Sequence, residues 1–265
     1  DMESKKYNLA FGLILAVFLL LNLFTLKSYG LTWDEPTQHN IGSVTISYMK
    51  GITDSEEFPR ADQIYYGPFF EILNQYFGGL MMNLGLDYTD AFHILIIFAS
   101  ALGLFFSYKL LSALINPRVA LMACALLMLS PRFIAHSHFN PKDIPLFAEF
   151  VISLYLLYSC FKNKKNSTAI WAGISIGLSL ATRVDSILIL PVFFIPYIAN
   201  LIVKKEWAAK KDAILLGIIS SSALLSVLIS WPILWKNPMI LFQSFFYFSM
   251  HHDWNSSVLY LGMLY

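Results

Sequence analysis

Residues 8–36 read NLAFGLILAVFLLLNLFTLKSYGLTWDEP, a long apolar segment followed by two adjacent acidic residues. The apolar part, residues 8–26, is long enough to cross a bilayer as one helix, which takes about 20 apolar residues. Because no small-residue cleavage site follows it, we interpret it as a retained anchor and not as a signal peptide. Asp34 and Glu35 then lie where the chain leaves the membrane, between a tryptophan and a proline.

The composition of the whole chain is that of a protein with many membrane-spanning segments. Of its 265 residues, 57% are hydrophobic and 13% are charged, whereas soluble globular proteins carry about 25% charged residues. A net charge of +1 without a basic patch argues against a nucleic-acid-binding protein. Both cysteines lie inside apolar runs, so the sequence suggests neither a disulfide framework nor a thiolate metal site.

Seven apolar segments are predicted to be transmembrane helices. They cover residues 8–26, 91–115, 119–135, 144–161, 168–184, 186–203 and 212–235. The third is uninterrupted only up to Leu129, so we expect a break at its outer end. The predicted fold is therefore an all-α polytopic membrane protein in which residues 1–265 form one transmembrane domain. We expect this chain to be the N-terminal part of a longer protein, with further spans or a soluble domain after it.

The basic residues predict the orientation of the bundle. Lysine and arginine gather in cytoplasmic loops, and 11 of the 18 here lie in the N-terminal ESKK and in segments 109–118, 162–165 and 204–211. The N-terminus is therefore predicted to be cytoplasmic and the acidic clusters extracytoplasmic, in what we expect to be a bacterial inner membrane. The first outer loop, residues 27–90, mixes apolar and polar residues at helical spacing, which predicts amphipathic helices along the membrane surface.

The acidic pair after the first span has two interpretations. Proline favours the first turn of a helix, and an acid just before it can cap the free backbone N–H groups. Alternatively, Asp34 hangs at the mouth of a cavity at the membrane surface and takes a proton from a hydroxyl group. The residues around the pair do not decide between them.

A second outer cluster lies in SPRFIAHSHFNPKDIPLFAEF, residues 130–150. Pro141 prevents a helix from continuing through this segment, so Asp143 is predicted near the start of the next helix, where the helix dipole favours an acid. Capping is the simpler interpretation of Asp143. His136 and His138, two residues apart, are only a weak metal signal.

Two more outer clusters are LATRVDS, residues 180–186, and SMHHDWNSS, residues 249–257. Arg183 and Asp185 in the first of them could simply pair with each other. However, all four clusters of mixed charge are predicted on one side of the bundle. Ionisable residues near a membrane are costly and usually mark a site or a pathway.

Taken in order, these motifs resemble the polytopic GT-C glycosyltransferases, specifically the family 39-type group of protein O-mannosyltransferases and the lipid A aminoarabinose transferase. Four elements carry the resemblance: the pair Asp34–Glu35, YYGPFFEIL at 65–73, DIPLFAEF at 143–150 and GLSLATRVDSILILP at 177–191. The resemblance covers essentially the whole chain. One departure is Gly67, where the lipid A enzymes have a lysine, so a lysine contact to the lipid phosphate is not expected there.

The resemblance implies an enzyme that moves a hexose or pentose from a polyprenyl phosphate to an extracytoplasmic protein, lipid or glycan, with inversion. A glycosyl phosphate already has a good leaving group, so one carboxylate base suffices. By resemblance Asp34 is this base, Glu35 an adjacent orienting or reserve acid, and Asp143 a second acid that positions the acceptor or helps hold a metal. The predicted ligands of the donor phosphate are Arg132, His138, Lys142 and Arg183. No cofactor is certain; a divalent cation (Mg, Mn or Zn) at Asp143, His136 or His138 is the candidate, and the polyprenyl tail would lie between spans among membrane lipids.

Two functions of other classes stay open. A transporter would place its charges at mid-membrane and show repeats or broken helices there, whereas here only Glu149 is predicted well inside the membrane. A non-catalytic subunit of a larger membrane complex is the second alternative, because such a chain could keep the fold and lose the reaction.

Overall fold

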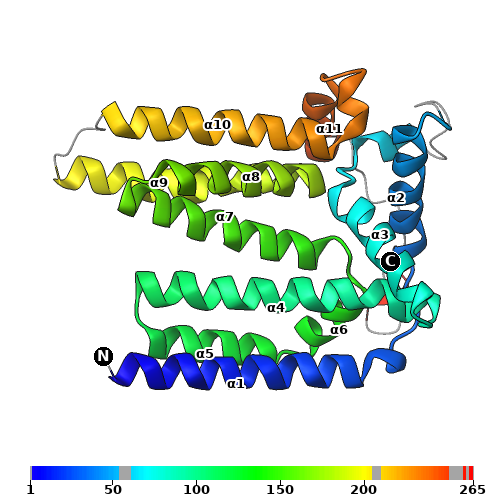
Figure 1. Cartoon of the computed structure of the whole chain (residues 1–265), viewed down its shortest axis with the longest axis horizontal. Helices are drawn as coiled ribbons and strands as arrows, with labels where there is room; N and C mark the ends of the chain where they lie inside the picture. The colour runs from blue at the N-terminus through cyan, green and yellow to red at the C-terminus, as the bar shows by residue number, and fades with distance from the viewer. Residues whose placement is uncertain (1, 54–60, 205–209, 251–258, 261–262, 265) are drawn as a thin grey trace.

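The computed structural model describes residues 2–53, 61–204, 210–250, 259–260 and 263–264, and nearly all of them are helical (Figure 1). The helices of the bundle are α1 (Met2–Phe24), α4 (Tyr88–Leu114), α5 (Pro117–Met128), α6 (Pro131–Phe139), α7 (Asp143–Asn163), α8 (Asn166–Thr182), α9 (Ile189–Lys204) and α10 (Lys210–Ser230). The other elements are α2 (Glu35–Met49), α3 (Phe69–Asn83), α11 (Ile240–Met250), the 3-10 turns η1 (Leu26–Ser28), η3 (Ala61–Tyr65), η4 (Val184–Leu188) and η5 (Pro232–Trp235), and the short antiparallel strands β1 (Leu259–Tyr260) and β2 (Met263–Leu264). The predicted class, an all-α polytopic membrane protein, is confirmed.

Fewer helices meet the length and apolar composition of a membrane span than the seven predicted. Among the described residues, five helices are long and apolar enough to cross a membrane, or six if the bent pair α5–α6 counts as one span. The segment predicted at 168–184 forms α8, which is only 17 residues long and carries several serines. More than half of its residues are buried, because it packs against α7 and α10. A helix covered by its neighbours needs less apolar surface than one that faces lipid.

The predicted break at the end of the third span is confirmed. α5 and α6 meet at an angle of 70°. Pro131 lacks the N–H that a continuous helix would need, and the Ser130 hydroxyl accepts a hydrogen bond from the Phe133 N–H at 3.4 Å, which starts a new helix. α6 therefore turns away from α5 and carries its polar residues to one end of the bundle.

The helices predicted in the first outer loop are present as α2 and α3. α2 runs across one end of the bundle and not along the long helices (Figure 1). It packs on α3, which packs on α4, and the backbones of α2 and α3 approach closely at Gly42, where a Cβ would lie 2.7 Å from the Glu71 carbonyl oxygen. This pair closes the end of the bundle that α6 reaches.

Two glycines one helical turn apart on α8 lie against α10, the helix with which α8 has its most extensive contact. A Cβ at Gly173 would overlap the side chain of Ser222, and one at Gly177 would lie 2.6 Å from the Ser226 Cβ. Such small-residue contacts drive helix association in membranes, where the hydrophobic effect between helices is weak. The Ser226 hydroxyl also donates to the Ile174 carbonyl at 3.2 Å.

We expect Gly177→Ala to lower the melting temperature of the purified protein, because overpacking costs roughly 1–3 kcal/mol. Gly217→Ala on α10 is the matched control, since a Cβ there meets nothing within 4 Å. Thermal unfolding in detergent checks this. Equal melting temperatures for the two variants would mean that α8 and α10 do not pack through Gly177.

Candidate functional site

A cavity of about 290 Å³ opens at the end of the bundle closed by α2 and α3. Its walls come from the start of α2 and the turn before it, from α6, from the start of α7 and the turn before it, and from the residue that follows α8. The lining residues are Thr32, Trp33, Asp34, Gln38, His136, Phe139, Asn140, Pro141, Lys142, Asp143 and Arg183. Asp34 and Asp143, far apart in the sequence, therefore face the same cavity.

Asp34 does not cap the helix that it precedes. It is the N-cap residue of α2, but its side chain makes no hydrogen bond to the helix backbone, and the residue is exposed. Pro36 in the first turn has no N–H to satisfy. Of the two interpretations of this acid, the geometry thus favours a side chain that is available to the cavity.

Glu35, the neighbour of Asp34, points into the protein instead and does not line the cavity. It is fully buried, its Oε1 accepts hydrogen bonds from the Thr32 N–H at 2.5 Å and the Thr32 hydroxyl at 2.7 Å, and its Oε2 lies 2.7 Å from His93 Nε2 on α4. Burial alone would raise the pKa of Glu35, but these hydrogen bonds outweigh it and hold the pKa below its usual value. Glu35 therefore ties the turn to α4 and so fixes the position of Asp34.

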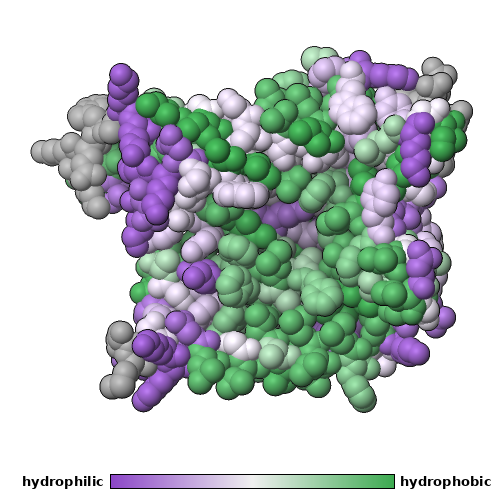
Figure 2. Space-filling view, in the orientation of Figure 1, coloured by the Kyte–Doolittle hydropathy of each residue, from purple (hydrophilic) through white to green (hydrophobic). Residues whose placement is uncertain are grey.

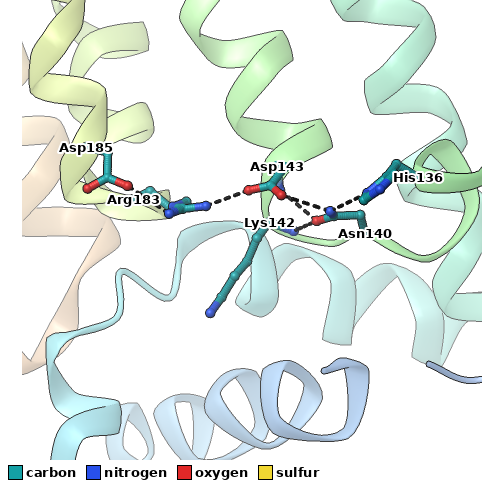
Figure 3. A network of polar contacts seen from close by, with 6 residues as sticks. All are labelled: His136, Asn140, Lys142, Asp143, Arg183 and Asp185. Atoms are coloured by element: carbon teal, nitrogen blue, oxygen red, sulfur yellow. Dashed lines mark hydrogen bonds and ion pairs between the residues drawn. The ribbon is translucent and has the colours of Figure 1, made fainter. Parts of the chain in front are cut away.

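Asp143 belongs to a chain of polar contacts across the cavity wall (Figure 3). Asn140 Nδ2 lies 3.0 Å from Asp143 Oδ2 and 2.7 Å from His136 Nδ1. On the other side Arg183 donates through Nη1 to Asp143 and through Nη2 to Asp185, the latter at 2.8 Å. The free backbone N–H groups at the start of α7 bind Asn140 Oδ1, which accepts from the Asp143 N–H at 2.8 Å and the Lys142 N–H at 3.1 Å. Asp143 is thus not the cap of α7.

Lys142 lies between this cavity and a second, smaller hollow of about 120 Å³. The second hollow is lined by Tyr65, Tyr66, Gly67, Lys142, Thr182, Arg183, Val184, Asp185 and Phe248. The Lys142 ammonium lies 3.9 Å from the centroid of the Tyr66 ring, a cation–π contact, and Figure 3 shows the side chain pointing away from the Asp143–Arg183 contact. Burial lowers the pKa of Lys142 to about 8, although the nearby Glu71 carboxyl opposes this.

The aromatic YYGP segment reaches the site because of Gly67. A Cβ at this position would overlap the carbonyl oxygen of Ala181 near the end of α8. The close approach brings Tyr66 and Arg183, from the second and fourth motifs, to the same hollow. It also explains why no lysine stands at this position, because a long side chain would push the segment off α8.

Two of the predicted phosphate ligands do not line the cavity. His138 is fully buried, with Nδ1 2.9 Å from the Ile134 carbonyl and Nε2 3.1 Å from the Asn22 carbonyl, so it joins α6 to α1. Arg132 is exposed in the first turn of α6. Lys142 and Arg183, the other two predicted ligands, both line it.

Three residues near the site were not identified as site residues in the sequence analysis. Trp33 is 94% exposed and lines the cavity beside Asp34. Asn140 holds the polar network together, and the NP dipeptide before a helix is a signal that could have identified it. Glu71 is buried in the first turn of α3, and burial raises its pKa to about 8, with Lys142 acting in the opposite direction.

The metal candidates are only partly brought together. His136 and Asp143 line the cavity and are linked through Asn140, whereas His138 is not part of it. In the part of the chain that the structure describes, no group of three or more His, Cys, Asp or Glu side chains is placed to hold a metal ion. The fourth predicted cluster, residues 249–257, lies almost wholly outside the described residues.

Comparison with known proteins gives one match. A family model described as dolichyl-phosphate-mannose-protein mannosyltransferase matches residues 71–231, which is more than half of the chain. No curated protein and no solved structure matches. The matched region contains Lys142, Asp143 and Arg183, whereas Asp34 lies before it.

Proposed function

Because the chain belongs to the dolichyl-phosphate-mannose-protein mannosyltransferase family, whose members are membrane glycosyltransferases that use polyprenyl-phosphate sugars, we propose that it transfers a sugar from such a donor to an extracytoplasmic acceptor with inversion. The observation that carries this proposal is the shared cavity. It brings two acidic groups, Asp34 and Asp143, and two cationic groups, Lys142 and Arg183, to one end of a membrane bundle. This combination fits a reaction in which an acceptor hydroxyl gives its proton to a carboxylate and the phosphate of the donor leaves next to a cation.

Asp34 is proposed as the general base. The acceptor oxygen would attack the anomeric carbon, the bond from that carbon to the phosphate oxygen would break, and the acceptor proton would pass to the Asp34 carboxylate. The other product would be the polyprenyl phosphate. Asp34 suits this role because it is exposed in the cavity and its side chain has no capping bond, while Glu35 holds the turn in place as an orienting group.

Lys142 and Arg183 are proposed to bind the donor phosphate. Negative charge grows on the departing phosphate in the transition state, and cations stabilise it there. Arginine presents several donors in a planar fork, and Arg183 already uses two of them toward Asp143 and Asp185. Asp143 would then position Arg183 and the acceptor. We also propose that this site can hold a divalent cation. His136 and Asp143 would be its protein ligands, and the donor phosphate would supply the remaining oxygen ligands.

We propose that the cavity faces away from the cytosol and that the N-terminus is cytoplasmic. Lysine and arginine favour the cytosolic side, and most of those in the described part of the chain lie at the end of the bundle opposite the cavity. Labelling of single cysteines introduced at Trp33 and at Arg118, with a reagent that cannot cross the membrane, tests this. Modification at Trp33 alone in intact cells or spheroplasts is expected, and modification at Arg118 alone would reverse the orientation.

The experiment that tests the proposed activity uses the purified protein in proteoliposomes with a polyprenyl-phosphate hexose and a peptide, lipid or glycan acceptor. We expect the donor to be consumed and the sugar to appear on the acceptor with the opposite anomeric configuration. A retained configuration would rule out a direct displacement. Solute flux without donor consumption would favour a transporter, and neither activity in the presence of every acceptor class would favour a non-catalytic subunit.

The donor KM should depend on the protonation of Lys142. Because burial lowers its pKa to about 8, the ammonium is mostly charged at pH 7 and loses its proton as the pH rises through 8. We therefore expect the KM for the donor to rise above pH 8. In Lys142→Arg, whose guanidinium stays charged, this rise should disappear. A KM that rises equally in both proteins would assign the effect to another group.

A further inference from the structure

A second large cavity lies at the opposite end of the bundle, away from the catalytic residues proposed above. It is a groove of about 680 Å³ between α4, α7 and α9. α7 diverges from α4 toward this end, as Figure 1 shows. The inner part of the groove is apolar and includes Leu154, Val192 and Phe193, while its outer part includes Tyr158 and Lys162. The groove is thus apolar inside and polar at its rim, like a lipid molecule.

The rim of the groove is held by hydrogen bonds. The Tyr158 hydroxyl donates to the Ala113 carbonyl at 3.2 Å, which ties α7 to the end of α4. Lys162 Nζ lies 3.1 Å from the Tyr158 hydroxyl oxygen. Lys164, two residues further along, also lines the groove but pairs with Asp212 on α10. Within the described part of the chain no acidic side chain pairs with Lys162, so its ammonium can receive an anion.

The surroundings of the rim are strongly basic. The described residues at this end of the bundle include Lys109, Arg118, Lys162, Lys164, Lys165, Lys210 and Lys211, and the acid beside the rim, Asp212, is already paired with Lys164. Figure 2 shows hydrophilic side chains gathered at this end of the molecule and an apolar surface beside them over the long helices. A ligand of this groove should therefore carry negative charge at its head and an apolar tail.

We propose that this groove binds an anionic glycerophospholipid. Its phosphate would lie at Lys162, and one acyl chain would run between α7 and α9 along Leu154 and Val192. Basic residues at a membrane surface favour anionic lipids, and the positive end of the bundle is the one predicted to face the cytosolic leaflet. This site is separate from the proposed transferase cavity and does not depend on it.

Native mass spectrometry of the purified protein tests the proposal, with equal amounts of dioleoylphosphatidylglycerol and dioleoylphosphatidylcholine in the detergent. We expect a bound phosphatidylglycerol in preference to phosphatidylcholine. Lys162→Gln should reduce that preference roughly fivefold, because one lysine near the surface has about that effect on anionic lipid binding. Val192→Trp, which fills the apolar part of the groove, should remove the bound lipid.

Lys109→Gln is the matched control, because Lys109 is exposed at the same end of α4 and does not line the groove. Equal binding of both lipids by the native protein would overturn the proposal. A phosphatidylglycerol preference that survives in both Lys162→Gln and Val192→Trp would also overturn it. So would a preference that falls as much in Lys109→Gln as in Lys162→Gln. Displacement of the bound lipid by an equimolar polyprenyl phosphate would assign the groove to that carrier instead.

Discussion

Replacing Asp34 with asparagine is expected to reduce kcat for sugar transfer by roughly 100- to 10,000-fold, the range that a general base contributes. Asparagine keeps the size of the side chain and removes its ability to take a proton. The hydrogen bonds of Glu35 that hold the turn do not involve the Asp34 side chain, so the protein should stay folded and inserted. The rate of polyprenyl phosphate release, measured at saturating donor and acceptor, checks this.

Asp87→Asn provides a matched control for the loss of an acid at a helix start. Asp87 is the N-cap of α4, makes no side-chain capping bond and is exposed, as is Asp34, but it does not line the cavity. Its activity should therefore remain close to that of the native protein. If Asp34→Asn lost about 1 kcal/mol of stability and kept its turnover, Asp34 would be a capping residue and another group would have to be the base.

The convergence of Asp34 and Asp143 could be predicted because it follows from topology. Each acid lies next to the end of an apolar helix, and the positions of lysine and arginine put both of those ends on one side of the membrane. A bundle of helices has little area at each end, so residues at the same end are forced close together. In the structure both acids line one cavity.

Which side chain of each cluster faces the cavity could not be predicted. His136 and His138 are two residues apart on a helix with 3.6 residues per turn, so they point to different faces. His136 lines the cavity, whereas His138 binds the carbonyl groups of α6 and α1. Asp34 and Glu35 diverge for a similar reason at the start of α2. Polar residues that are neighbours in the sequence therefore need not face the same site.

The sequence segment that forms α8 does not have the usual composition of a membrane span. α8 was predicted as one apolar span among seven, but its small and polar residues, such as Gly173 and Ser175, pack against α7 and α10. With 17 residues and several small or polar side chains, α8 falls short of the length and apolar composition expected of a span, although it lies alongside α7 and α10. α8 ends at Thr182, and Arg183, which follows it with an extended backbone, lines the cavity.

Replacing Arg183 with glutamine should lower kcat/KM for the donor by roughly 100-fold, because a hydrogen bond between charged groups contributes about 1.5–3 kcal/mol. Arg183 joins Asp143 to Asp185 and faces both hollows, so its loss removes a phosphate ligand and also frees Asp143. Arg183→Lys should recover only part of the activity, since an ammonium cannot bridge two carboxylates and a phosphate with a planar fork. Steady-state kinetics with a polyprenyl-phosphate hexose measures both variants.

Arg132→Gln is the control that distinguishes a site effect from a general loss of positive charge. Both arginines were candidate phosphate ligands from the sequence, but Arg132 is exposed on α6 and outside the cavity, so its variant should keep nearly native kcat/KM. Asp185→Asn should have an intermediate effect, because it removes one of the two carboxylates that orient Arg183. Equal losses in Arg132→Gln and Arg183→Gln would contradict a local role. The donor phosphate would then be attracted by the field of this end of the bundle, and not held by the contact between α8 and the start of α7.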